Sequence, residues 1–309
     1  MKRHVLLASD GSPYTQKATS YLAEVFSHRD DLEVTVLSVA PALPSYLTRH
    51  VPGLSELERE ERLERLQAEG LARAQKIVQE TIDQLKRKGF PEEALHPKVT
   101  SRYGDLASVI LHEARQGHFD ALVAGRRGLG RLSSAWVGSV TQKLTEYGRN
   151  LPVWVIDGKS WNKRFLVAVD LGEAGRKVLD HVVFMLSPDP EVELELLHVV
   201  SSIFPGEKEE GLEEMQKILM EKEKEEAAAF FTAAREMIEA EGFRGKVRVK
   251  IKSSPTGAAG SILKEAREGG FGTVVVGRRG RGGFKELLLG SVSSKVLFGL
   301  NDRAIWVVG

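Results

Sequence analysis

The sequence contains no cysteine, which excludes disulfides, thiolate catalysis and cysteine-ligated metal sites. No segment approaches the roughly 18 uninterrupted apolar residues that a membrane helix needs. The apolar run at residues 5–8 is too short for a signal peptide. The formal net charge is only +1 over 309 residues, so no bulk charge attracts nucleic acid. We therefore expect a cytoplasmic protein that binds neither membranes nor nucleic acids.

The sequence also lacks the residue patterns of histidine metal sites and of the two commonest nucleotide-binding loops. The eight histidines show no spacing typical of metal ligands, so we expect no metal bound by protein side chains. A Walker A loop needs a Gly-Lys-Ser/Thr ending that the chain does not contain. A Rossmann glycine motif would follow the first strand, and that position instead carries Asp10-Gly11-Ser12.

What the chain does contain is one glycine motif, present twice with the spacing Gly-x2-Gly-x9-Gly-Ser. The two copies are Gly125, Gly128, Gly138 and Ser139, and Gly277, Gly280, Gly290 and Ser291. The offset between the copies is 152 residues throughout. Each copy follows an apolar run and precedes a segment with helical apolar spacing. A strand, a glycine loop and a helix start together are typical of an anion site, because glycines allow positive φ and close approach and the helix start offers unpaired N–H groups. A serine there can cap the helix or face a phosphate.

Arg127 and Arg279 lie between the first two glycines of each copy, where a guanidinium can bind phosphate oxygens in a fork. Asp10 and Asp170 follow the first strand of each half. The local alternative for Asp10 is an Asx-turn with Gly11. One carboxylate can serve both roles, because it has several lone pairs.

Alternating apolar runs and helical stripes predict an α/β fold with two tandem doubly wound domains, residues 1–157 and 163–309. Each domain is expected to hold a five-stranded parallel sheet, in the order 3-2-1-4-5, with helices on both faces. Ligands bind such sheets beyond the carboxyl ends of the strands, at the switch point. We therefore expect the aspartate and the glycine loop of each half to face one crevice.

Two further stretches carry predictions. The charged segments 54–88 and 207–241 are predicted to be long helices whose charges form a solvated face. Residues 41–53 form a proline-containing excursion that is either a lid over a site or an ordinary surface loop.

The doubled glycine motif resembles the nucleotide-binding motif of the ATP-binding universal stress proteins. The resemblance implies an adenine nucleotide as ligand, ATP or else ADP or AMP, with Mg²⁺ or Mn²⁺ carried by the nucleotide. It implies that the aspartates contact the adenosine and that Val39 and Val199 line the base pocket. The contacts expected in the first half are Asp10, Val39, Gly125, Arg127, Gly128, Gly138, Ser139, Val140 and Thr141. Those expected in the second half are Asp170, Val199, Gly277, Arg279, Gly280, Gly290, Ser291, Val292 and Ser293.

Universal stress proteins pair their domains through the last strand, which in the two halves of this chain carries Trp154 and Trp306. The resemblance therefore implies a pseudo-twofold pair of domains within the chain. A homodimer is left open. The alternative reading of both tryptophans is an ordinary core position.

The resulting functional hypothesis is a nucleotide-dependent switch or sensor in the stress response. The alternatives are a slow ATPase or nucleotidyl-transfer enzyme, and an interaction module that binds no nucleotide. We assign no catalytic residue, because the glycine motifs contain no acidic residue and the Ser139 and Ser291 hydroxyls are poor bases. At most weak ATP hydrolysis is expected.

Overall fold

The computed structural model describes residues 2–27, 29–43, 55–129, 137–187, 189–201, 210–254, 257–279 and 289–309. The chain divides into two compact units, and the division falls between Leu151 and Pro152. Most of the predicted excursion at 41–53, and Gly280 of the second glycine motif, lie outside the described residues. Among the described helices, none is long and apolar enough to cross a membrane.

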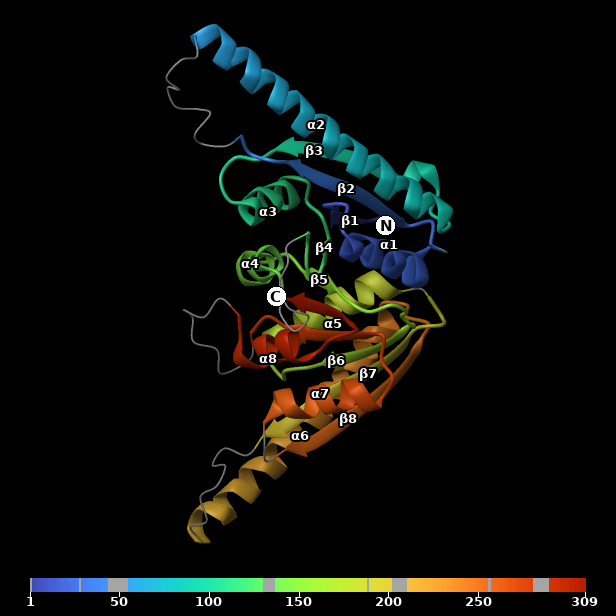
Figure 1. Cartoon of the computed structure of the whole chain (residues 1–309). Coiled ribbons are helices and arrows are strands. Elements are labelled where there is room, and N and C mark those ends of the chain that lie inside the picture. Colours follow the sequence, from blue (N-terminus) through green and yellow to red (C-terminus); the bar gives the residue numbers. More distant parts are fainter. Residues whose placement is uncertain are drawn as a thin grey trace. The chain divides into compact units, whose positions relative to one another are not determined.

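The first unit contains a parallel sheet in the order β3-β2-β1-β4. Its strands are β1 (Arg3–Ala8), β2 (Leu32–Ala40), β3 (Leu95–Ser101) and β4 (Ala121–Gly125). Its helices are α1 (Pro13–Phe26), α2 (Glu56–Arg87), the short 3-10 helix η1 (Glu92–Ala94), α3 (Leu106–Gln116) and α4 (Ser139–Tyr147). Helix α1 packs against α2, α3 packs against α4, and α2 runs along β2 and β3 (Figure 1).

Local sequence explains where the helices of this unit begin. Ser12 caps α1 by accepting a hydrogen bond from the Thr15 N–H, and Pro13 occupies the first turn, as a Ser-Pro pair predicts. A reciprocal capping box between Ser55 and Glu58 starts α2. These caps satisfy backbone N–H groups that have no partner within the helix.

The long helix α2 is anchored by its C-terminal half alone. Its buried residues are Gly70, Ala74, Val78, Thr81, Ile82 and Leu85, whereas residues 56–69 are exposed or only partly buried. Helix α6 (Glu210–Ala240) repeats this arrangement in the second unit, with Ala227, Phe231, Ala234 and Ile238 buried. The prediction that the charged run of α2 forms a solvated face is confirmed.

The second unit has the strand order β8-β7-β6-β9-β10, which is the predicted 3-2-1-4-5 order. These strands are β6 (Arg164–Ala168), β7 (Glu193–Ser201), β8 (Lys246–Ser254), β9 (Thr273–Gly277) and β10 (Ala304–Val308). The other helices are α5 (Glu173–Leu186), α7 (Ala258–Glu268) and α8 (Ser291–Gly299). Helix α5 contacts α6, and α7 contacts α8, so the predicted doubly wound α/β class is confirmed.

Strand β5 (Val153–Ile156) groups with the second unit, where it pairs antiparallel with β10. Trp154 lies opposite Trp306 in this pair. The two indole rings are fully buried and stack with centroids 3.9 Å apart and an interplanar angle of 1°. Both tryptophans are therefore core residues of the second unit, although Trp154 precedes the interdomain linker in sequence.

Candidate functional site

Sheet register places each aspartate beside the start of a glycine loop. In the first unit β1 pairs with β4, and Ala8 lies opposite Ala124. In the second unit Ala168 lies opposite Val276 in the same way. Both strands of each pair end at the same edge, so the residues that follow them share that edge, as the predicted topology requires.

Asp10 binds both its own turn and the glycine loop. Its Oδ1 accepts hydrogen bonds from the Ser12 N–H and the Thr15 hydroxyl, each 3.0 Å away. Its Oδ2 accepts from the Leu129 N–H at 3.2 Å. A Cβ on Gly128 would lie 2.5 Å from the same oxygen. The Asx-turn alternative is thus realised, and the other carboxylate oxygen holds the beginning of the loop.

Close approach, not positive φ, explains the glycines of the motif. None of Gly125, Gly128, Gly138, Gly277 and Gly290 is among the described residues with positive φ. A Cβ on Gly125 would lie 2.6 Å from Tyr14 Cβ, and one on Gly138 would lie 3.3 Å from Arg127 Cα. The expectation that these glycines supply positive φ is therefore wrong, whereas the close approach of backbones is present.

The helices after both loops begin without a side-chain cap. Gly138 and Gly290 occupy the N-cap positions of α4 and α8, and no side chain bonds to either first turn. Ser139 and Ser291 are the first helical residues and are exposed. They do not cap these helices, so the first turns have no side-chain cap, and an uncapped helix start can bind an anion.

The next polar residue of each helix instead forms a hydrogen bond with the glycine at the end of the preceding strand. Thr141 Oγ1 donates to the Gly125 carbonyl at 2.9 Å, and Ser293 Oγ donates to the Gly277 carbonyl at 2.5 Å. The Gly138 N–H donates to the Arg126 carbonyl at 2.9 Å, and the Gly290 N–H donates to the Arg278 carbonyl at 2.8 Å. The two halves therefore hold their described loop ends by the same hydrogen bonds.

The remaining predicted residues of the first half lie around this loop. The Arg127 guanidinium donates from Nη1 to the Tyr14 hydroxyl at 2.6 Å and lies over the Tyr14 ring. Val39 is partly buried and lies two residues beyond Leu37, the partner of Ala8 in the sheet, which brings it level with Asp10. Val140 is partly buried in the first turn of α4.

In the second half the structure brings the predicted residues together around a cavity of about 530 Å³. Every described residue of the predicted set lines it, namely Asp170, Val199, Gly277, Arg279, Gly290, Ser291, Val292 and Ser293. Apolar side chains supply much of the rest, including Leu171, Val178, Leu197, Ile262 and Val276. A cavity with a mostly apolar wall and a few converging polar groups is typical of a small-molecule site.

His198 and Glu223 also line this cavity, and neither was predicted from the sequence. The His198 Nδ1 atom lies 2.9 Å from the Val169 carbonyl, and the Nε2 atom lies 3.0 Å from Glu223 Oε1. A carbonyl only accepts, so Nδ1 carries a proton. His198 directly precedes the predicted Val199, which was a usable signal. Glu223 belongs to the charged run of α6.

Gly175 is a third residue of this cavity that was not predicted from the sequence. It lies inside α5 and lines the cavity, and a Cβ there would lie 1.7 Å from the Asp170 carbonyl oxygen. The Asp170 carboxylate accepts from the Gly172 N–H at 2.6 Å, which forms the same Asx-turn as Asp10. Gly175 therefore lets helix α5 start against the end of strand β6.

Comparison with known proteins agrees with this fold. The family model described as the Universal stress protein family matches residues 1–156 and 162–298. Over 142 residues the chain is 32% identical to universal stress protein YxiE of Bacillus subtilis (strain 168), which covers 43% of this chain and 90% of YxiE.

Solved structures show the same architecture over the whole chain. A universal stress protein from Archaeoglobus fulgidus DSM 4304 is 22% identical and has a TM-score of 0.62, covering 99% of this chain and 97% of its own. A protein of unknown function from Pseudomonas aeruginosa PAO1 is 14% identical with a TM-score of 0.56, covering 99% and 92%. These likenesses show the fold alone. Because the family model matches most of both halves, the chain belongs to the universal stress protein family.

Proposed function

We propose that this universal stress protein binds an adenine nucleotide of the ATP class in each half and acts as a nucleotide-dependent switch or sensor in the cytoplasm. The observation that carries the proposal is the cavity of the second half, whose wall contains all the described residues expected to contact nucleotide there. Its volume of about 530 Å³ lies within the usual range for small-molecule sites.

The polar groups of this cavity suit a polyphosphate at one side. Gly290 starts α8 without a side-chain cap, so the positive end of the helix dipole faces the cavity. Arg279 adds a cation that lines the same space. The apolar wall around Val199 and Ile262 suits a base and sugar. Mg²⁺ or Mn²⁺ carried by the nucleotide would bridge phosphates and solvent.

The two halves are expected to bind with different strength. In the first half the Arg127 side chain is bonded to Tyr14, and the Leu129 N–H is bonded to Asp10. A ligand there must compete with these contacts. In the second half Arg279 and Asp170 already line a cavity. We therefore propose that the second half fills first.

The first experiment is mass spectrometry of small molecules released from the purified protein, followed by calorimetric titration with ATP, ADP and AMP. Gly290→Val places bulk 3.0 Å from the Arg278 carbonyl and should abolish the tighter site. Gly138→Val is the matched variant of the first half and should leave the tighter site intact. Circular dichroism checks that both variants fold.

The proposal fails if no adenine nucleotide is released and none gives heat on titration. That result would favour the interaction module instead. It fails equally if nucleotide binds and neither glycine variant changes the affinity, because binding would then lie elsewhere.

Slow hydrolysis is a second candidate, and one observation favours it: Glu223 and His198, both able to handle protons, line the nucleotide cavity. Steady phosphate release that falls at least tenfold in Glu223→Gln would support a hydrolase. Tight binding without phosphate release would leave the switch as the function.

A further inference from the structure

Two histidines and a glutamate meet at the edge of the first sheet where the strands begin, opposite the edge that carries the glycine loop. They are His4 on β1, Glu33 on β2 and His96 on β3. One ligand atom from each lies within 4.8 Å of the others. Neutral imidazole and carboxylate are the ligands that zinc and related divalent ions share.

Sheet register explains why these side chains share one face. His4 lies opposite Glu33, and His96 lies opposite Thr35. Glu33 and Thr35 are two residues apart on one strand and therefore point to the same face. Three neighbouring strands thus present the three groups from a rigid, paired framework, which is favourable for a preorganised site.

The contacts within this cluster are polar and close. The His96 Nε2 atom lies 3.3 Å from Glu33 Oε2, and His4 Nε2 lies 2.7 Å from Thr35 Oγ1. The backbone N–H of His4 donates to Asp120 Oδ2 at 2.7 Å. Lys2 Nζ lies 2.5 Å from Glu33 Oε1. Lys2 is the group that competes with a metal for the carboxylate.

The electrostatics favour the ligand forms of His4 and Glu33. Burial lowers the pKa of His4, although Glu33 opposes this effect, so His4 is a neutral imidazole at neutral pH. The hydrogen bond from Lys2 lowers the pKa of Glu33, which keeps that group a carboxylate. Metal ions bind deprotonated ligands of this kind.

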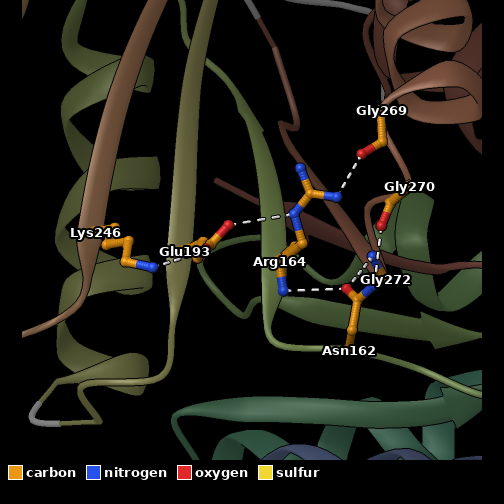
Figure 2. A network of polar contacts seen from close by, with 7 residues as sticks. All are labelled: Asn162, Arg164, Glu193, Lys246, Gly269, Gly270 and Gly272. Carbon is orange, nitrogen blue, oxygen red and sulfur yellow. Dashed lines mark hydrogen bonds and ion pairs between the residues drawn. The ribbon is translucent and has the colours of Figure 1, made fainter.

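The second half shows what the same position looks like as a purely structural network. Arg164 lies opposite Glu193 there, as His4 lies opposite Glu33. Figure 2 shows Glu193 between Arg164 and Lys246. Glu193 Oε2 lies 3.3 Å from Arg164 Nε, and Glu193 Oε1 lies 3.1 Å from Lys246 Nζ. The Arg164 guanidinium also donates to the Gly269 carbonyl. Asn162 Oδ1 accepts from the Arg164 and Gly272 N–H groups (Figure 2). Two permanent cations, Arg164 and Lys246, neutralise Glu193. Glu33 has one such partner, Lys2, and the imidazole of His4 occupies the position that Arg164 has in the second half.

We propose that His4, Glu33 and His96 bind a divalent transition-metal ion of the zinc class, independently of the nucleotide. Ligand atoms about 2 Å from a tetrahedral ion lie roughly 3.4 Å apart. The present ligand atoms lie within 4.8 Å of one another, so the side chains must close in by up to about 1.4 Å. The Lys2 side chain is 70% exposed and can release Glu33. The His96 side chain is 43% exposed, which leaves the fourth position open to water. Three protein ligands and one open position are typical of reactive rather than structural zinc sites.

The test uses the full chain, freed of metal and nucleotide, titrated with Zn²⁺ by calorimetry and with Co²⁺ by absorption spectroscopy. We expect one ion per chain and the visible bands of tetrahedral cobalt. His96→Gln and Glu33→Gln should each lower the affinity at least tenfold. Lys2→Met should raise it severalfold, because it removes the competing ammonium group.

Glu193→Gln in the second half is the matched control and should leave the affinity unchanged. His96 is partly exposed, so its replacement by glutamine should leave the far-ultraviolet circular dichroism unaltered. Absence of stoichiometric uptake, or uptake that His96→Gln does not weaken, would overturn the proposal. Neither outcome depends on whether nucleotide binds.

Discussion

His181 is a partly buried histidine whose ring lies beside two tryptophans. Its Nε2 accepts a hydrogen bond from the Trp154 indole N–H at 3.1 Å, and the Trp306 ring centroid is 5.6 Å away. Burial lowers the pKa of His181 from 6.5 to about 3. The ring is therefore neutral, with its proton on Nδ1, and protonation would remove the acceptor that Trp154 needs.

This burial makes stability depend on pH with a definite sign. The folded pKa of His181, about 3, lies below its unfolded value of 6.5, so the unfolded state binds the extra proton. The stabilisation is complete above pH 6.5 and is lost as pH falls toward 3, at up to about 1.4 kcal/mol per pH unit. Urea unfolding, monitored by tryptophan fluorescence at several pH values in this range, measures how steeply the free energy of unfolding changes with pH.

His181→Phe should have lower stability at neutral pH, because Trp154 loses its acceptor, but a shallower pH slope. Carboxylates that titrate in the same range contribute equally to both proteins and cancel in the comparison. If the slopes of the two proteins coincide, His181 does not cause the dependence.

Thr141 is the residue that ties the first glycine loop to its strand. Its buried hydroxyl donates to the Gly125 carbonyl. Thr141→Val keeps the shape and removes this bond, so we expect a loss of about 1 kcal/mol in the free energy of unfolding. Chemical denaturation measures it. Thr232→Val is the control, because that exposed hydroxyl bonds to the Ala228 carbonyl within its own helix and its loss should cost less. Equal losses would contradict a special role for Thr141.

At the scale of elements, two helical glycines look alike in sequence but have opposite surroundings. Gly70 in α2 has room for a methyl group, because an added Cβ would meet the Pro41 ring at 3.4 Å, an ordinary van der Waals contact. Gly175 in α5 has no room for a methyl group, because an added Cβ would lie 1.7 Å from the Asp170 carbonyl oxygen. Helix propensity favours alanine by about 1 kcal/mol at both positions.

We therefore predict that Gly70→Ala stabilises the protein by about 0.5–1 kcal/mol, whereas Gly175→Ala destabilises it by about 1–3 kcal/mol. At Gly175 the steric cost exceeds the gain in propensity, and α5 must move away from β6. Thermal unfolding of both variants checks the opposite signs. Stabilisation by both would show that α5 adjusts freely.

At the scale of the whole chain, two copies of one fold carry different chemistry at corresponding places. On β7 the second unit holds His198 against Glu223, whereas the corresponding register position on β2 of the first unit is Ser38. At the opposite edge the first unit has His4 and His96, whereas the corresponding register positions of the second unit are Arg164 and Arg248. The halves have therefore diverged in their polar groups while keeping the same backbone.

This divergence predicts ordered occupancy by nucleotide. On addition of ATP, hydrogen exchange should slow in residues 277–279 and 289–293 at lower concentration than in residues 125–129 and 138–141. In this proposal bound nucleotide would order the loops by accepting hydrogen bonds from their N–H groups. Mass-spectrometric exchange over an ATP series measures both segments in one sample. Unchanged exchange in both glycine-loop segments would contradict ordering by nucleotide. Protection of both segments at the same ATP concentration would contradict the proposal that the second half binds nucleotide first. The pseudo-twofold pairing of the halves and a homodimer remain predictions.

The sequence alone determined the fold class and the family, because both depend on periodic patterns. Apolar runs and helical stripes marked the strands and helices, as the Ser12-Pro13 start of α1 shows. The glycine spacing, repeated at a constant offset, marked the position of the candidate site. These signals are local, so they survive without knowledge of which strands meet.

The tertiary structure alone decided which side chains share a site. Glu223 looked like one more charge on a solvated helix, yet it contacts His198 inside a cavity. His4, Glu33 and His96 are far apart in sequence and meet only because β1, β2 and β3 pair in a particular register. Trp154 joins the second unit because β5 pairs with β10. Such contacts depend on strand order and register, which bring distant residues together and leave no periodic trace in the sequence.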